Sequence, residues 1–207
     1  RLCLLGGTPE RRSLLGSAYK RRAWTGLGDS RKADLSVASE NYGIAARLEG
    51  SSVSRYARLN ELMLQFLASS DTESAGLLDG VKEVERVVKR SVEKNPTDVW
   101  LWVQLADAKF LRWMLMDSSI KLLTLTNDYV EQFAFGASSR VQSSVMDQFE
   151  FMVEVLSGRL DEEDDNTVND LVLNRLNMVV RLHEGLTAAA KRLGAHKETI
   201  EETKASE

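Results

Sequence analysis

The stretch that decides the fold is LLGSAYKRRA (residues 14–23) together with ADLSVASENYGIAARLEG (residues 33–50). The first segment has the spacing L-G-x2-Y from Leu15, and the second has the spacing A-x3-Y-x2-A from Ala38. A small residue beside a large apolar one lets two helices approach closely, and an aromatic ring fills the space next to it. The two segments therefore predict a tightly packed pair of helices.

The ends of this helix pair carry partial signals. Thr8 is expected to cap the first helix, because Pro9 suits the first helical position. Ser30 or Asp34 is expected to cap the second helix. The extra stretch between the two patterns, residues 24–33, must lengthen the first helix or its loop.

Helical spacing of apolar residues continues through most of the chain, and no convincing strand pattern interrupts it. Only two prolines are present, so long helices are allowed almost everywhere. We therefore expect an all-α chain of about eight helices. Their apolar positions span residues 14–23, 35–48, 56–67, 77–92, 102–114, 122–133, 145–156 and 167–193.

The first pattern recurs further along the chain. Counting on from Gly50 places Tyr56, Leu59 and Asn60 at its three key positions, and Pro96 closes the unit. A further count places Trp102, Leu105 and Ala106 at the same positions. Gly16, Asn60 and Ala106 would then mark the close contact inside successive helix pairs. A stacked solenoid explains this register, and a closed helical bundle is the alternative.

With this register the chain resembles the tetratricopeptide-repeat superfamily over residues 9–157. The resemblance implies a right-handed solenoid of helix pairs. We divide the chain into a lead-in (1–8), degenerate repeat pairs (9–157), an acidic loop (158–166), a long C-terminal capping helix (167–194) and a polar tail (195–207).

The segment ERRSLLGSAYKR (residues 10–21) is also similar to repeat regions of bacterial proteins that carry a caspase-like CHAT protease or another conflict-system effector. In such proteins the repeats act as a sensor or regulator of the effector. The sequence contains no effector domain of this kind, so this resemblance implies a regulatory arm of a longer protein.

A solenoid of this kind implies a protein- or peptide-binding scaffold that uses the concave face lined by the first helix of each pair. Lys20 and Arg21 would pair with acidic ligand groups, and Trp100 and Phe110 would anchor an apolar side chain. The full set of expected groove residues is Ser13, Ser17, Lys20, Arg21, Ala57, Glu61, Leu64, Trp100, Val103, Asp107 and Phe110.

Some repeat proteins hold a C-terminal carboxylate with Lys, Asn and Arg side chains. The matching positions in this chain are Ser13, Ser17, Trp100 and Gln104, which cannot supply that charge. An internal or mixed peptide segment is therefore the expected ligand.

The sequence offers no constellation for catalysis, a metal or a cofactor, so we do not expect an enzyme. Its two histidines, His183 and His196, are far apart, and Cys3 has no histidine near it in sequence. The acidic run at residues 161–165 lacks the alternation and glycine of a calcium loop. We interpret His183 as a core or boundary residue and the acidic run as a solvated connector.

Charge and composition limit the partners further. Residues 1–32 carry a charge of +6 within a chain of net charge −4, so the remainder is strongly acidic. Nucleic acid is therefore not an expected partner. Nucleic-acid sensing by the basic first helix pair is a third hypothesis, and steep salt dependence of binding would mark it.

A single cysteine and the lack of a long apolar run favour a cytoplasmic location without a membrane span. A homo-oligomer formed through Leu2, Leu4 and Leu5 is also compatible.

Overall fold

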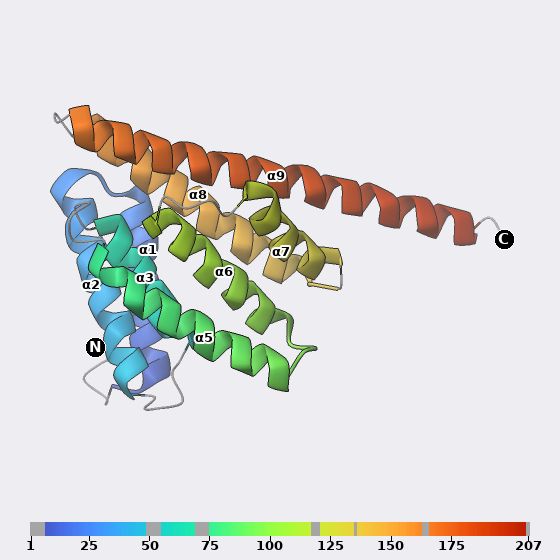
Figure 1. Cartoon of the computed structure of the whole chain (residues 1–207), viewed down its shortest axis with the longest axis horizontal. Coiled ribbons are helices and arrows are strands. Elements are labelled where there is room, and N and C mark those ends of the chain that lie inside the picture. Colours follow the sequence, from blue (N-terminus) through green and yellow to red (C-terminus); the bar gives the residue numbers. More distant parts are fainter. Residues whose placement is uncertain are drawn as a thin grey trace.

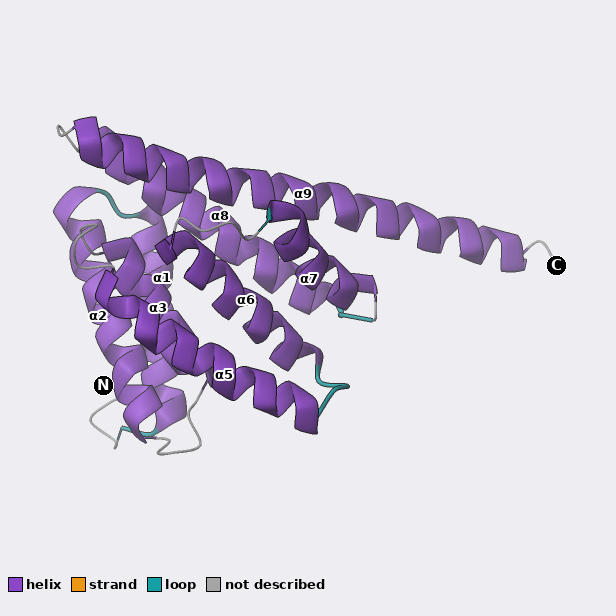
Figure 2. Cartoon of the chain, in the orientation of Figure 1, coloured by secondary structure: helices purple, strands orange, loops and turns teal. Residues whose placement is uncertain are grey.

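The computed structural model describes residues 7–48, 55–68, 75–116, 121–134, 136–162 and 166–205, and these form helices without a strand (Figure 2). The prediction of an all-helical chain with about eight α-helices is confirmed for these residues. In chain order the elements are α1 (Pro9–Thr25), α2 (Gly28–Leu48), α3 (Arg55–Ala68), the 3-10 helix η2 (Ala75–Leu77), α5 (Leu78–Lys94), α6 (Val99–Met116), α7 (Leu122–Ala134), α8 (Ser139–Glu162) and α9 (Asn166–Ala205). None of the described helices is both long enough and apolar enough to cross a bilayer.

Helix α1 begins and ends as its sequence predicts. The Thr8 side-chain oxygen accepts a hydrogen bond from the Arg11 backbone N–H at 3.4 Å, and Pro9 is the first helical residue. At the other end the Gly26 backbone N–H donates to the Arg22 carbonyl at 3.0 Å. These contacts satisfy polar groups that a helix terminus leaves without an internal partner.

Helix α2 begins earlier than expected, at Gly28 with φ 53° rather than at Ser30 or Asp34. The extra residues therefore lengthen both helices and leave a connection of only two residues, 26 and 27. Asp34 lies inside α2 and is nearly fully buried. Its carboxylate accepts a hydrogen bond from Arg22 Nε at 2.6 Å and a second from Arg22 Nη2. This guanidinium holds the pKa of Asp34 below its ordinary value, so the side chain serves as an ion-pair partner and not as a cap.

Gly16 is the point of closest approach between α1 and α2. A Cβ atom at this position would lie 2.8 Å from Cδ2 and 2.9 Å from Cε2 of Tyr42. The Tyr42 ring is only 1% exposed, so it has little room to move away. The glycine of the L-G-x2-Y pattern therefore makes room for the aromatic ring of Tyr42.

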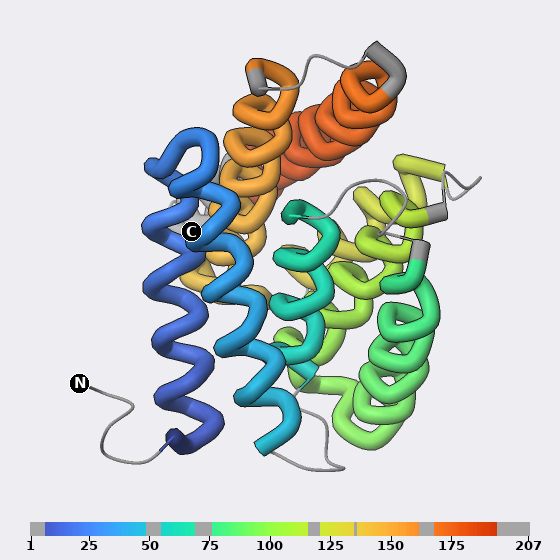
Figure 3. Tube along the Cα trace, turned by 90° about the vertical axis from the view of Figure 1, so that its left-hand side faces the viewer, coloured from blue at the N-terminus to red at the C-terminus, as the bar shows by residue number. Residues whose placement is uncertain are grey.

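The helices follow one another in space for the first part of the chain. Helices α1, α2, α3 and α5 lie side by side in chain order (Figure 3), and α5 packs on α6, which packs on α7. Helix α8 then returns to the start of the chain and packs against α1, α2 and α3. Helix α9 lies along α8 and α7 and continues past the other helices (Figure 1).

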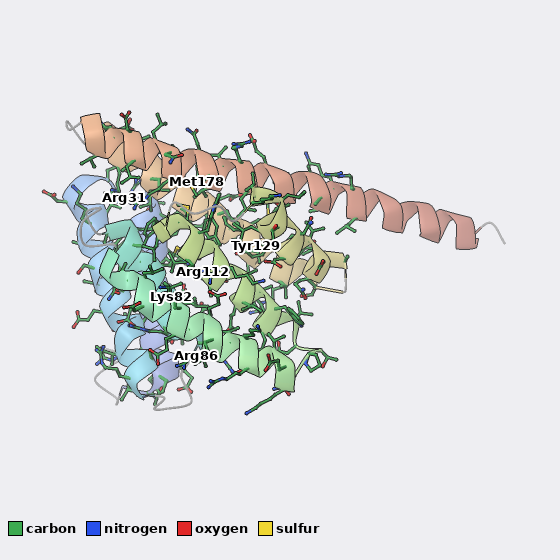
Figure 4. The ribbon with its side chains drawn as sticks, in the orientation of Figure 1. Arg31, Lys82, Arg86, Arg112, Tyr129 and Met178 are labelled. Carbon is green, nitrogen blue, oxygen red and sulfur yellow. The ribbon has the colours of Figure 1, made fainter. Side chains whose placement is uncertain are left out.

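Helix α8 lies between α2 on one side and α6 and α7 on the other. Its Phe149 ring packs edge-to-face on Phe110 of α6 at 5.2 Å and on Tyr129 of α7 at 5.5 Å. On the other side the buried Arg31 of α2 donates from Nη1 to the Glu154 carbonyl at 3.0 Å and from Nη2 to Glu154 Oε1 at 3.2 Å. Arg31 and Tyr129, labelled in Figure 4, thus lie at opposite ends of the contact surface of α8.

Helix α9 is longer than the capping helix expected at residues 167–194. It runs from Asn166 to Ala205, so most of the expected polar tail continues the helix. No proline interrupts this segment, and its many Ala, Lys and Glu residues have high helix propensity. Its inward face buries Val172, Val179, Leu182 and Leu186. The acidic loop is shorter than expected, because α8 extends to Glu162; residues 163–165 lie outside the described part.

Replacing Gly16 with alanine should lower the free energy of unfolding by up to about 2 kcal/mol. Alanine favours a helix by about 1 kcal/mol, but the new methyl group collides with a ring that cannot move, which costs about 1 to 3 kcal/mol. Urea denaturation followed by circular dichroism measures the difference. The matched control is Gly185→Ala in α9, where the nearest atom would lie at an ordinary 3.5 Å. This variant should be slightly more stable than wild type, and equal effects at both positions would contradict the packing argument.

Candidate functional site

Helices α1, α3, α6 and α8 surround a cavity of about 220 Å³, which we call the central cavity. Helices α1, α3 and α6 are the three that the sequence register had placed first in their pairs. The lining residues are Ser17, Lys20, Arg21, Trp24, Tyr42, Tyr56, Leu59, Asn60, Trp100, Val103, Gln104, Asp107, Ser144, Val145, Asp147, Gln148 and Phe151. Side chains from distant parts of the chain therefore share one small enclosed space.

Lys20 is the cation of the central cavity. Its Nζ donates hydrogen bonds to Gln148 Oε1 and, at 3.4 Å, to Asn60 Oδ1, and it lies 5.1 Å from the centre of the Phe151 ring. Both acceptors are neutral amides, so they stabilise the ammonium less than a carboxylate would. Burial lowers the pKa of Lys20 to about 8, against an opposing attraction from Asp107.

Asp107 is the half-buried acid of the same cavity. Its Oδ1 accepts a hydrogen bond from the Tyr129 hydroxyl at 2.7 Å. Burial raises the pKa of Asp107 to about 6, although the Tyr129 hydrogen bond and the Lys20 charge both favour the ionised form. Lys20 and Asp107 are thus a base and an acid of one cavity, and burial disfavours the charged form of each.

Aromatic rings form much of the cavity wall. Tyr42 and Tyr56 pack edge-to-face at 6.1 Å, and Trp24 packs on Phe151 at 6.0 Å. Trp100 stands at the rim with 41% of its surface exposed. The cavity can therefore accept one apolar group that packs on these rings and also makes hydrogen bonds to the polar lining residues.

Gln104 adds an unused acceptor to this wall. Its Oε1 atom is buried and has no hydrogen-bond partner among the described residues. A buried amide oxygen without a donor costs free energy, and a ligand N–H group would remove that cost.

Six of the expected groove residues line the central cavity, namely Ser17, Lys20, Arg21, Trp100, Val103 and Asp107. Trp100 and Val103 come from α6 at the positions expected to face a ligand. Lys20 and Arg21 are placed differently, because Lys20 is half-buried and Arg21 is exposed at the rim.

The structure places the other expected residues elsewhere. Ser13 lies on α1 outside the cavity lining, and Phe110 is only 1% exposed beneath Phe149, so it cannot anchor a ligand. Glu61 is buried, pairs with Arg58 Nη1 at 2.5 Å and lines two hollows on the opposite side of α3. Ala57 and Leu64 are core residues. A tightly packed α3, with apolar residues on most of its surface, explains why so few of its expected positions face the cavity.

Sequence reasoning did not anticipate that α8 forms one wall of the cavity. Its contribution consists of Ser144, Val145, Asp147, Gln148 and Phe151. One signal was available: the buried residues of α8 cover more than one stripe of the helix, as expected for a helix with neighbours on several sides. These residues are Val141, Val145, Phe149, Phe151, Met152, Val155 and Leu156.

The basic residues of the first helix pair are largely engaged within the molecule. Arg12 Nη1 donates to Asn41 Oδ1 at 3.1 Å, Arg22 pairs with Asp34, and Arg31 pairs with Glu154. Lys20 points into the central cavity. The +6 charge of residues 1–32 is therefore not a single free patch, and it leaves fewer cations for phosphate contacts than the sequence suggests.

The described residues contain no group of three or more His, Cys, Asp or Glu side chains that could hold a metal ion. His183 is half-buried, with Nε2 at 3.7 Å from Glu150 Oε1, which agrees with the expected boundary position. Cys3 and the His196 side chain lie outside the described part.

No protein-family model, no curated protein and no solved structure matches this chain.

The basic member of the cavity should make stability rise with pH. In the folded protein the Lys20 pKa of about 8 lies below its ordinary value of 10.5, so between these pH values the unfolded chain binds more protons. The free energy of unfolding of wild type should therefore gain about 1 to 2 kcal/mol over this window relative to Lys20→Met. Urea melts at successive pH values measure this, and parallel curves for the two proteins would contradict it.

The acidic member should act in the opposite direction. The Asp107 pKa of about 6 lies above its ordinary value of 3.8, so the folded protein binds more protons in that interval. Stability should fall as the pH rises from 3.8 to 6. This fall amounts to about 1 kcal/mol. Asp107→Asn, which keeps an acceptor for Tyr129, should not show it. Thermal melts of both proteins across this range test the expectation, which fails if the variant retains the full slope.

Proposed function

We propose that the chain is a non-catalytic scaffold of the tetratricopeptide-repeat type that binds a protein or peptide segment at the central cavity. The observation that carries the proposal is the convergence of α1, α3 and α6 on one aromatic-walled cavity in which the buried Gln104 oxygen has no hydrogen-bond partner among the described residues. These are the helices that a right-handed solenoid of helix pairs would place on its concave face.

The size of the central cavity limits the ligand. Most ligand pockets have volumes of about 300 to 1,000 Å³, whereas this one has about 220 Å³. The space suits one side chain and the backbone next to it, while the rest of a peptide would lie across the rim. Trp100 at the rim would contact the peptide, and the buried Gln104 oxygen would accept a hydrogen bond from it.

The charges of the cavity favour a segment of mixed character. Lys20 and Arg21 are balanced by Asp107 and Asp147, so the lining has no net charge. A strongly acidic or strongly basic peptide would leave two of these groups without a partner, which costs free energy in a buried site. We therefore expect an internal segment with an apolar anchor and polar neighbours.

A random peptide library displayed on phage provides the test. Peptides enriched on the wild-type protein should bind Trp100→Ala at least about tenfold more weakly, because Trp side chains are among those that most often carry the binding energy of an interface. Fluorescence anisotropy of labelled synthetic peptides measures the affinities. Leu123→Ala is the matched control, since Leu123 is an exposed apolar residue of α7 that does not line the cavity. Peptides that bind all three proteins equally would contradict the proposal.

The second proposal is a regulatory or sensor arm of a larger bacterial effector enzyme, such as a CHAT protease. The position of α8 favours it, because a helix of the chain itself already packs on α1 and α3 and reduces the space between them. A scaffold whose face is covered in this way would respond to other domains of its own full-length chain. Binding of this purified chain to a neighbouring domain, and not to free peptides, would distinguish this proposal from the first.

A further inference from the structure

The amine of Lys20 has unusual surroundings for a lysine. It lies in the wall of the central cavity, against the Phe151 ring, and its hydrogen-bond acceptors are the side-chain oxygens of Asn60 and Gln148. Among the described residues, no carboxylate forms an ion pair with it. Other lysines of the same chain, such as Lys89, have exposed side chains.

The charges that face Lys20 come from three of the helices around the cavity. Arg21 lies on its own helix, Asp107 on α6 and Asp147 on α8, while α3 contributes only neutral groups. Arg21 and Asp147 are exposed at the rim, where water screens them. Asp107 is the half-buried counter-charge, and its Oδ1 atom is already engaged by the Tyr129 hydroxyl.

An ammonium in this position is poorly compensated for its lost hydration. Burial without a close anion favours the neutral amine, and the pKa of about 8 agrees with this. A lysine amine with a lowered pKa is a nucleophile near neutral pH, which is how lysines that form Schiff bases are activated.

We propose that Lys20 is a covalent modification site whose amine forms an imine with a small aromatic aldehyde that enters the central cavity. The aromatic rings that line the cavity indicate that the aldehyde is aromatic. The rings of Trp24, Tyr42, Tyr56 and Phe151 would pack against an aromatic ring, and about 220 Å³ leaves room for one such ring.

The reaction balances without an oxidant or reductant. The lone pair of neutral Lys20 Nζ attacks the aldehyde carbon, and the carbonyl electrons move to oxygen to give a carbinolamine after proton transfer. The carbinolamine hydroxyl then leaves as water with a proton from the Asp107 carboxyl, while the nitrogen lone pair forms the C=N bond. The resulting iminium returns one proton to Asp107, so one aldehyde and one amine give one imine and one water. Asp107 suits this exchange because its pKa of about 6 keeps both protonation states populated near neutrality.

Reductive trapping tests the proposal on the whole chain. The protein is incubated at neutral pH with benzaldehyde and sodium cyanoborohydride, and the rate of benzyl addition at each lysine is measured by peptide mass spectrometry. Lys20 should be labelled at least about tenfold faster than the exposed Lys89, because burial lowers its pKa to about 8 and the cavity holds the aldehyde beside its amine. Equal rates at the two lysines would overturn the proposal.

Two controls separate a cavity site from a merely reactive amine. Pyrenecarboxaldehyde has the same reactive group but is too large for the cavity, so it should label Lys20 no faster than Lys89. Preference for Lys20 with both aldehydes would show that the cavity does not select the aldehyde, and would overturn the proposal. Lys20→Arg keeps the charge and should leave labelling of Lys89 unchanged. If this variant fails to fold, the comparison of the two aldehydes on wild type still decides.

Discussion

The packing of Phe149 between Phe110 and Tyr129 is the contact on which the rest of the structure depends. It fixes α8 against α6 and α7, while Arg31 fixes the other side of α8 to α2 through two hydrogen bonds to Glu154. One helix therefore joins the first part of the chain to the later part. Together with α3, it closes the space between α1 and α6.

The same helix creates the chemistry of the central cavity. Because α8 covers Lys20 and brings Gln148 and Phe151 to it, the lysine loses water and gains only neutral partners. Asp107 is half-buried by the same arrangement and depends on Tyr129 for its hydrogen bond. Packing elsewhere in the molecule thus holds the polar side chains of Lys20 and Asp107 in partly dehydrated positions, which is typical of sites that bind or react.

Local features of the chain could be predicted well. Thr8 and Pro9 set the start of α1, because capping depends on residues within one turn. The small residue at Gly16 also predicted close packing of the first helix pair, although its partner Tyr42 lies in another helix. The candidate site could be predicted in part. Lys20, Trp100 and Asp107 were expected from the repeat register and line the cavity, whereas Phe110 and Glu61, chosen by the same reasoning, are buried on other faces. A helical register gives spacing along a helix but does not say which neighbours its faces will meet.

The sequence by itself determined the helices, their approximate limits and the close packing of the first helix pair, since these follow from spacing and residue size within short segments. Only the tertiary structure decided that α8 returns to α1, that Asp34 is an ion-pair partner inside α2, and that Lys20 and Asp107 share a cavity. Hydrogen bonds such as Lys20 to Gln148 join residues 128 positions apart. Such pairings depend on the packing of the whole chain, and no local pattern encodes them.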